Sequence, residues 1–282
     1  MPEDKSYFTI QVLVKAFMVI DIMAREAKWE FATLAREAGL PKGTLQRILL
    51  TLADLGYVSW EKGGQYALTL KYYKLGQRIA SNNPVLDHAR PSCRQLMQEV
   101  NETVNLCVPL NTDMVVIDQQ VSWQTLRLDS VIGSSFSLFL SASGKAYCAF
   151  LDELSLLKTM DLVRRSTPGV TDADVDAFME ELSLVRREGI AFDWEGIFQG
   201  VRCVAAPVFD CTGRIAATVG ISVPVVRIDG EKSSDCIRGV LNCAAQISRN
   251  LGAPSHLYSK CSRTMLDPAP AKSGAESAKA SS

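Results

Sequence analysis

Apolar residues recur at helical spacing in three short segments near the start of the chain, residues 10–24, 30–38 and 43–55. We expect Gly39 to end the second helix in a left-handed conformation, and Pro41 suits the start of the third. In the first helix, the spacing predicts that the buried face is formed by Leu13, Phe17, Ile20 and Ala24.

Two β-prone runs follow, residues 57–60 and 65–69, and Gly63-Gly64 between them can take the positive φ angles of a tight hairpin. Three short helices and a hairpin predict a winged helix-turn-helix over residues 1–70. An alternative is a protein-binding module whose third helix has a solvated polar face. In the DNA-binding interpretation, the polar side chains expected to contact DNA are Lys42, Thr44, Gln46, Arg47, Thr51 and Lys62.

The rest of the chain mixes helices and strands. Residues 71–83 predict a linker helix, residues 84–252 a larger domain, and residues 253–282, where Pro, Ala, Ser and Lys dominate, a disordered tail. Within the larger domain, helices are expected at 84–100, 144–151, 153–163, 172–187 and 233–251, and strands at 103–110, 114–121, 125–129, 201–209 and 215–223. The last two strands form an antiparallel hairpin, so the fold class is α+β, a sheet with helices packed on it.

The net charge of −1 conceals an asymmetry between the two parts of the chain. Residues 1–78 carry 11 Lys and Arg against 8 Asp and Glu, whereas the remainder carries 19 against 23. DNA binding by such a mildly basic unit must depend on local placement of charge.

No apolar run approaches 18 residues, and the N-terminus does not resemble a secretion signal. We therefore expect a cytoplasmic protein with no membrane partner.

The residues that enzymes and metal sites require are sparse. No two of the eight cysteines are separated by only two residues, and the two histidines belong to no cluster. Gly144-Lys145 lacks the glycine spacing of a phosphate loop, and residues 220–224 end in Pro224 where a nucleophile elbow needs glycine. We expect neither a metal nor a cofactor, and no enzymatic activity; a thiol hydrolase is the least favoured alternative.

The segment from Asp193 to Val208 combines two carboxylates, a glycine-rich turn and an apolar strand that begins near Cys203. A few polar groups among apolar neighbours are typical of a small-ligand pocket. In one alternative, Asp193 and Glu195 only cap a loop. In another, Cys203 senses thiol oxidants, although a neighbouring carboxylate should raise rather than lower the pKa of its thiol.

Two motif blocks give the chain a family resemblance over about residues 8–251. The first runs from Leu40 to Arg47 and continues from Leu52 to Val58; the second comprises residues 102–106, 143–146 and 193–208. In both blocks the chain resembles the IclR-type transcriptional regulators. The resemblance implies a GAF-like effector-binding domain after the winged helix-turn-helix, homodimers that often pair into tetramers, and an operator of double-stranded DNA.

The resemblance also implies a set of effector contacts: Ala142, Ser143, Asp193, Cys203, Gly220 and Ser222. Gly220 stands where many members have serine, which removes a hydroxyl donor, adds space and favours an effector bulkier than a very small oxo acid. Gly43 likewise replaces a commoner serine, so we expect the third helix to lack a side-chain N-cap worth about 1 kcal/mol. The predicted function is a DNA-binding regulator whose operator affinity responds to a small organic acid or aromatic effector.

Overall fold

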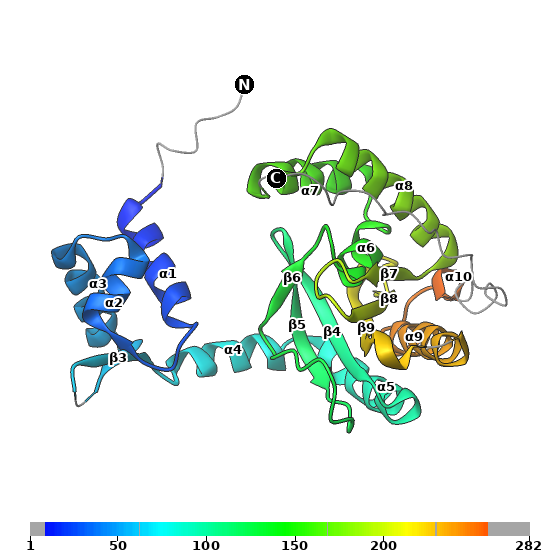
Figure 1. The fold of residues 1–282 in the computed structure, drawn as a ribbon, viewed down its shortest axis with the longest axis horizontal. Coiled ribbons are helices and arrows are strands. Elements are labelled where there is room, and N and C mark those ends of the chain that lie inside the picture. Colours follow the sequence, from blue (N-terminus) through cyan, green and yellow to red (C-terminus); the bar gives the residue numbers. More distant parts are fainter. Residues whose placement is uncertain (1–8, 62, 168, 229, 259–282) are drawn as a thin grey trace, which may run out of the picture. The chain divides into compact units, whose positions relative to one another are not determined.

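The computed structural model describes residues 9–61, 63–167, 169–228 and 230–258. Contacts within the chain divide it into two compact units, Met1–Asn83 and Pro84–Ser282 (Figure 1). Lys62, one of the expected DNA contacts, and residues 259–282 of the expected tail lie outside the described residues.

The first unit contains three helices and a small sheet. The helices are α1 (Gln11–Met23), α2 (Phe31–Ala38) and α3 (Lys42–Asp54), and Gly39 ends α2 with a left-handed φ of 61°, as expected. The antiparallel sheet has the order β1 (Trp29–Glu30), β3 (Gln65–Leu68), β2 (Val58–Trp60). Helix α4 (Lys71–Ser81) follows and buries none of its residues within the unit.

The predicted buried face of α1 is wrong except at Ile20, which is half-buried against the core. Leu13 and Phe17 are 51% and 63% exposed, whereas Val19, Ile22 and Met23 enter the core of this unit. Nearly every position of the segment is apolar, so the spacing does not distinguish the face that packs on α2 from the one that faces outward. The outward side of α1 is consequently an apolar surface.

Helix α3 begins one residue earlier than expected, which changes the role of Gly43. Pro41 is the N-cap residue, and its carbonyl oxygen accepts the amides of Thr44 and Leu45 at 2.9 and 3.1 Å. Gly43 therefore lies inside the first turn, and its replacement of serine removes no N-cap at that position.

The second unit is a six-stranded antiparallel sheet with helices on both faces (Figure 1). Helices α5 (Pro84–Val100) and α9 (Gly230–Asn250) cover one face; α6 (Ala142–Cys148) packs on the other, with α7 (Glu153–Ser166) and α8 (Asp172–Glu188) beyond it. The strand order is β6 (Ser135–Ser137), β5 (Asp113–Gln120), β4 (Thr103–Leu110), β9 (Ile215–Pro224), β8 (Val201–Phe209), β7 (Ala191–Trp194). A turn of 3₁₀ helix (Val225–Arg227) follows β9.

Three features of this unit differ from the sequence expectations. Residues 125–129 form no strand; they are irregular, and Arg127 donates to the carbonyl of Gln124 and to Asp129. Strands β6 and β7 were not expected. The first described part of the expected disordered tail is ordered, because Ala253 is buried and α10 (Ser255–Tyr258) forms, with Tyr258 beneath the Arg249 guanidinium.

Among the described helices, none is both long and apolar enough to span a lipid bilayer.

Candidate functional sites

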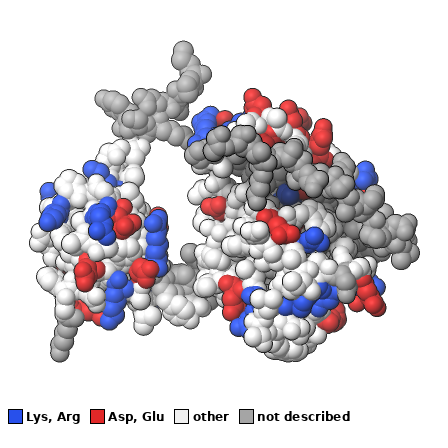
Figure 2. Space-filling model, in the orientation of Figure 1, with Lys and Arg blue, Asp and Glu red and all other residues white. Residues whose placement is uncertain are grey.

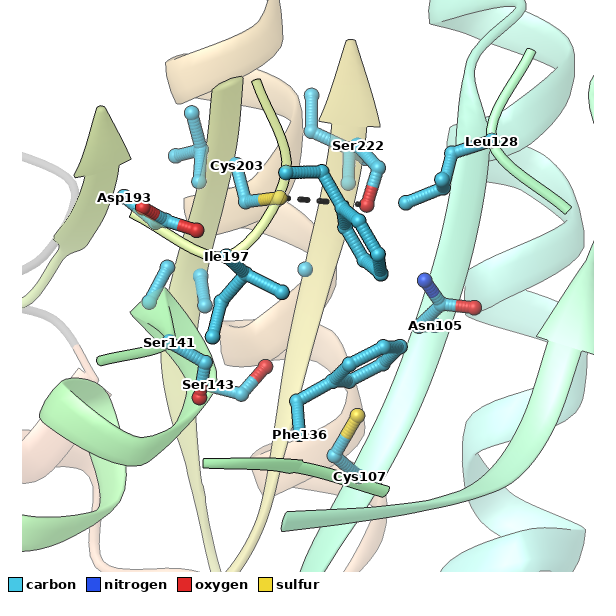
Figure 3. A pocket seen from close by; sticks show the side chains of 16 residues that line it. Asn105, Cys107, Leu128, Phe136, Ser141, Ser143, Asp193, Ile197, Cys203 and Ser222 are labelled. Carbon is cyan, nitrogen blue, oxygen red and sulfur yellow. Dashed lines mark hydrogen bonds between the residues drawn. The ribbon is translucent and has the colours of Figure 1, made fainter. Parts of the chain in front are cut away.

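A row of polar side chains crosses four strands on the face of the sheet that carries α6. Strand register places Thr103 opposite Ser222, Ser222 opposite Cys203, and Cys203 opposite Asp193. Directly opposite residues in antiparallel strands project to the same face, so the last three, far apart in sequence, become neighbours. The Cys203 thiol and the Ser222 hydroxyl are 3.4 Å apart (Figure 3).

This row borders a pocket of about 40 Å³. All six residues expected to contact an effector line it: Ala142, Ser143, Asp193, Cys203, Gly220 and Ser222. In its present form the pocket has room for about three water molecules, so the added space expected from Gly220 has not produced a large cavity. Gly220 instead fits close strand packing, since a Cβ there would lie 2.6 Å from the carbonyl oxygen of Val204.

The sequence did not predict the apolar wall of the pocket or two of its polar residues, Asn105 and Ser141. Much of the wall is formed by Leu128, Phe136, Ile197 and Phe198. The rings of Phe136 and Phe198 pack edge to face, with their centroids 6.0 Å apart. These wall residues lie on irregular segments or on the three-residue strand β6, which have no periodic signal. Asn105 belongs to a motif quoted above, and its place two residues from Thr103 on β4 was a usable signal. Ser141 is the N-cap of α6, and its hydroxyl accepts the amide of Gly144.

Asp193 closes a turn and also faces the pocket. Its carboxylate is 2% exposed, and Oδ1 accepts the amide of Gly196 at 2.6 Å. Glu195 similarly accepts the amide of Gly200 at 2.8 Å, so the loop-capping alternative is correct as a description of both carboxylates. Burial raises the pKa of Asp193, against the lowering effects of its amide hydrogen bonds and of Lys145. The site therefore offers an acceptor that can be protonated more easily than an exposed aspartate.

Cys203 has the environment of an unreactive thiol. Burial raises its pKa to about 11, against the lowering effect of the hydrogen bond with Ser222, and the nearby Asp193 adds a smaller increase. Burial also raises the pKa of the neighbouring Cys107 to about 12, although Ser143 lowers it in part. Because the thiolate is the reactive form, this environment opposes both the oxidation-sensing and the hydrolase alternatives.

Helix α6 is held against the sheet by two unusual contacts. A Cβ on Gly144 would lie 1.8 Å from the carbonyl oxygen of Leu138, so only glycine fits this close approach. Lys145 is largely buried. Its ammonium nitrogen donates a hydrogen bond to the carbonyl oxygen of Phe192 at 3.1 Å and forms an ion pair with the carboxylate of Glu181 at 2.9 Å. These contacts explain the Gly-Lys pair as packing, and they fix Ala142 and Ser143 over the pocket.

The outer face of α3 bears the side chains expected to contact DNA. Lys42, Gln46, Arg47 and Thr51 are exposed, and Thr44 is half-buried. No ion pair among the described residues involves Lys42 or Arg47, so both cations are free for an external anion. The Thr51 hydroxyl donates to the carbonyl of Arg47 at 2.8 Å, which leaves it only as an acceptor. Lys and Arg are interspersed with Asp and Glu on the face of this unit shown in Figure 2, so no broad basic surface supports binding there.

A three-helix unit with a β-wing, followed by a sheet domain with a small enclosed pocket, defines the class of DNA-binding transcriptional regulators. Family models match both parts: the IclR helix-turn-helix domain over residues 12–62, and the C-terminal domain of bacterial IclR transcriptional regulators over residues 77–249. The chain belongs to the IclR family.

Relatives and solved structures agree with this assignment. The regulator KdgR of Escherichia coli is 30% identical over 88% of this chain and 95% of its own length. The regulator BhcR of Paracoccus denitrificans is 30% identical over 85% of this chain and 86% of its own. The crystal structure of Thermotoga maritima IclR has a TM-score of 0.66 at 26% identity, over 86% of this chain and 100% of that one.

Proposed function

We propose that this regulator binds an operator through α3 and releases or holds it according to whether a small organic effector, an organic acid or an aromatic compound, occupies the pocket beside Asp193. One observation carries the proposal: Asp193, Cys203 and Ser222 form a continuous polar row that faces a small pocket with a largely apolar wall. Few polar groups placed among apolar ones are the usual composition of a small-molecule site.

Recognition of the operator is assigned to the exposed face of α3. Arg47 is suited to a bidentate contact with a guanine edge, and Gln46 to adenine. Lys42, in the first turn, is placed for a phosphate. Lys62, which follows Glu61 in the sequence, is proposed as a further phosphate contact. Regulators of this kind act on the chromosome, so we place the protein in the cytoplasm.

A homodimer is the assembly this proposal requires, with a tetramer as its further pairing. One recognition helix per chain reads one half-site, and two-fold operators space half-sites about 34 Å or a multiple apart. The outward face of α1 supports a self-association surface, since Val12, Leu13, Val14 and Phe17 are all at least half exposed.

Two pocket variants test the effector site in the full-length protein. Ser222→Val removes a hydroxyl at nearly constant volume and should weaken effector binding by about 1–3 kcal/mol. Cys203→Ser keeps a small side chain with a stronger donor, so the response of DNA binding to the effector should survive.

Calorimetric titration measures the affinity of each variant for the effector, and a DNA-binding assay measures release of the operator in parallel. The compounds tested as effectors are the metabolites of the pathway that the neighbouring genes encode. Loss of the response in Cys203→Ser, with an intact response in Ser222→Val, would replace the effector mechanism with a thiol-based one.

A further inference from the structure

Asn105 is a buried polar residue of the pocket to which neither the family motif nor the proposed function gives a role. It lies on β4, is 6% exposed and lines the cavity. Its Oδ1 accepts a hydrogen bond from Gln119 Nε2 at 3.0 Å, from the neighbouring strand β5. That bond fixes the amide group, and Figure 3 shows the side-chain nitrogen turned toward the interior of the pocket and the oxygen turned away.

Small residues keep this amide accessible from the cavity. Strand register places Gly220 directly opposite Asn105, and Ala205 directly opposite Gly220. A side chain at Gly220 would project from the same face of the sheet as Asn105. The glycine therefore leaves the donor uncovered.

The polar groups of the pocket differ in what they offer. Asn105 Nδ2 is a donor, whereas Asp193, when ionised, only accepts. Ser222 and Cys203 lie on the two strands between them, and Leu128, Phe136 and Ile197 form an apolar part of the wall. A ligand that satisfies both ends needs an acceptor oxygen toward β4 and a hydroxyl donor toward β7.

We infer that Asn105 determines effector specificity by donating through Nδ2 to a carbonyl oxygen, so that the pocket selects small hydroxycarbonyl compounds over alcohols of the same size. The inference rests on the proposed function only for its location, since it concerns which molecules the pocket accepts. A buried donor left without a partner lowers affinity, so a ligand without the carbonyl is rejected.

Two matched probes test the inference on the full-length protein. Hydroxyacetone carries a carbonyl and a hydroxyl, and 1-propanol is its analogue without the carbonyl. In NMR-detected titrations the wild type should bind hydroxyacetone about tenfold more tightly than 1-propanol, the effect of one hydrogen bond to a buried donor. Asn105→Leu should bring this ratio close to one. Gln119→Leu should lower it less, because the amide remains but is no longer oriented.

Thr218→Val is the matched control. Thr218 is fully buried on the same face of the sheet, opposite Cys107, but does not line the pocket. The ratio should be unchanged in this variant. The inference is overturned if Asn105→Leu keeps the wild-type ratio while remaining folded, or if hydroxyacetone does not bind the wild type.

The outcome for the proposed function is separate. If the affinity ratio depends on Asn105 but no pocket ligand alters operator binding, the specificity inference stands and the proposed function fails. If an effector releases the operator but the ratio does not depend on Asn105, only the specificity inference fails.

Discussion

At the scale of single residues, the buried polar groups of the sheet divide into those with partners and those without. Thr103 and Thr218 are both fully buried on strands of the pocket face. The Thr103 hydroxyl accepts the amide of Ser122 at 3.3 Å, whereas the Thr218 hydroxyl has no hydrogen-bond partner among the described residues. An unpaired buried hydroxyl carries a desolvation cost that a paired one recovers.

Thr218→Val should therefore stabilise the protein by about 1 kcal/mol, because it removes the unpaired hydroxyl at almost constant volume. Thr103→Val, the matched control, should destabilise it by about 1–2 kcal/mol, because it leaves the Ser122 amide unpaired. Denaturant unfolding monitored by circular dichroism measures both. Equal effects of the two substitutions would show that hydrogen bonding at these positions does not matter.

The thiol of Cys203 should resist alkylation at neutral pH. With a pKa of about 11, only about one molecule in a thousand carries the thiolate at pH 8, and the fraction rises toward pH 11. Iodoacetamide labelling followed by peptide mass spectrometry should modify the exposed Cys211 first. Fast labelling of Cys203 at pH 7–8 would instead restore the oxidation-sensing alternative.

At the scale of elements, sequence patterns predicted long helices and long strands well but not short strands. Helices such as α5 and α8 have enough turns for their apolar stripe to be unambiguous. Strands β1, β6 and β7 have two to four residues, and each exists because a neighbouring strand pairs with it. Residues 125–129 show the converse, because a β-prone run without a paired neighbour stays irregular.

The same limit applied to the candidate site. Asp193 and Cys203 could be found because the segment from Asp193 to Val208 has a distinctive composition, and Ser222 because the family resemblance implies it. Phe136 and Phe198 could not, because their approach to the pocket depends on the path of irregular chain. On α1 nearly every position is apolar, so the sequence contains no polar face from which the buried face could be identified.

The close packing of α6 predicts that alanine substitution has opposite effects on stability at two glycines, Gly144 and Gly76. Gly144→Ala should destabilise the protein by about 3 kcal/mol or more, since the new Cβ would overlap the carbonyl of Leu138. Gly76 lies in the middle of α4, and a Cβ added there would have no other atom within 4 Å beyond its own helix backbone and chain neighbours. Gly76→Ala should therefore stabilise the protein by about 0.5–1 kcal/mol through helix propensity. Thermal unfolding of both variants makes the comparison; a tolerated Gly144→Ala would contradict the packing described for α6.

The role of α3 gives a prediction about DNA. Arg47→Ala should reduce operator affinity by about 1–3 kcal/mol and relax sequence preference. Lys42→Ala should weaken binding to all sequences and reduce the salt dependence by about one unit of slope. Binding is measured by fluorescence anisotropy on operators selected from genomic DNA. Arg165→Ala, an exposed charge on α7, serves as the control, and unchanged binding in both α3 variants would remove this helix from the interface.

At the scale of the whole molecule, the proposed homodimer predicts that DNA binding depends on self-association. Phe17→Glu places a charge on the apolar outer face of α1 and should shift the protein toward monomer and weaken operator binding at least tenfold, because a single recognition helix then acts alone. Leu154→Glu, at a similarly exposed apolar position on α7, is the control. Sedimentation equilibrium and DNA titration at several protein concentrations test this; a Phe17→Glu dimer with full affinity would contradict the α1 interface.

The small volume of the pocket has a consequence for how strongly any effector appears to bind. A molecule larger than about three waters fits only those protein molecules in which the lining residues, Phe136 and Phe198 among them, have moved to enlarge the pocket. When such an open form makes up between 0.1% and 10% of the population, the measured dissociation constant is about ten to a thousand times the intrinsic one. A modest apparent affinity is then compatible with a closely fitting complex, and a regulator of this construction responds only when its effector accumulates.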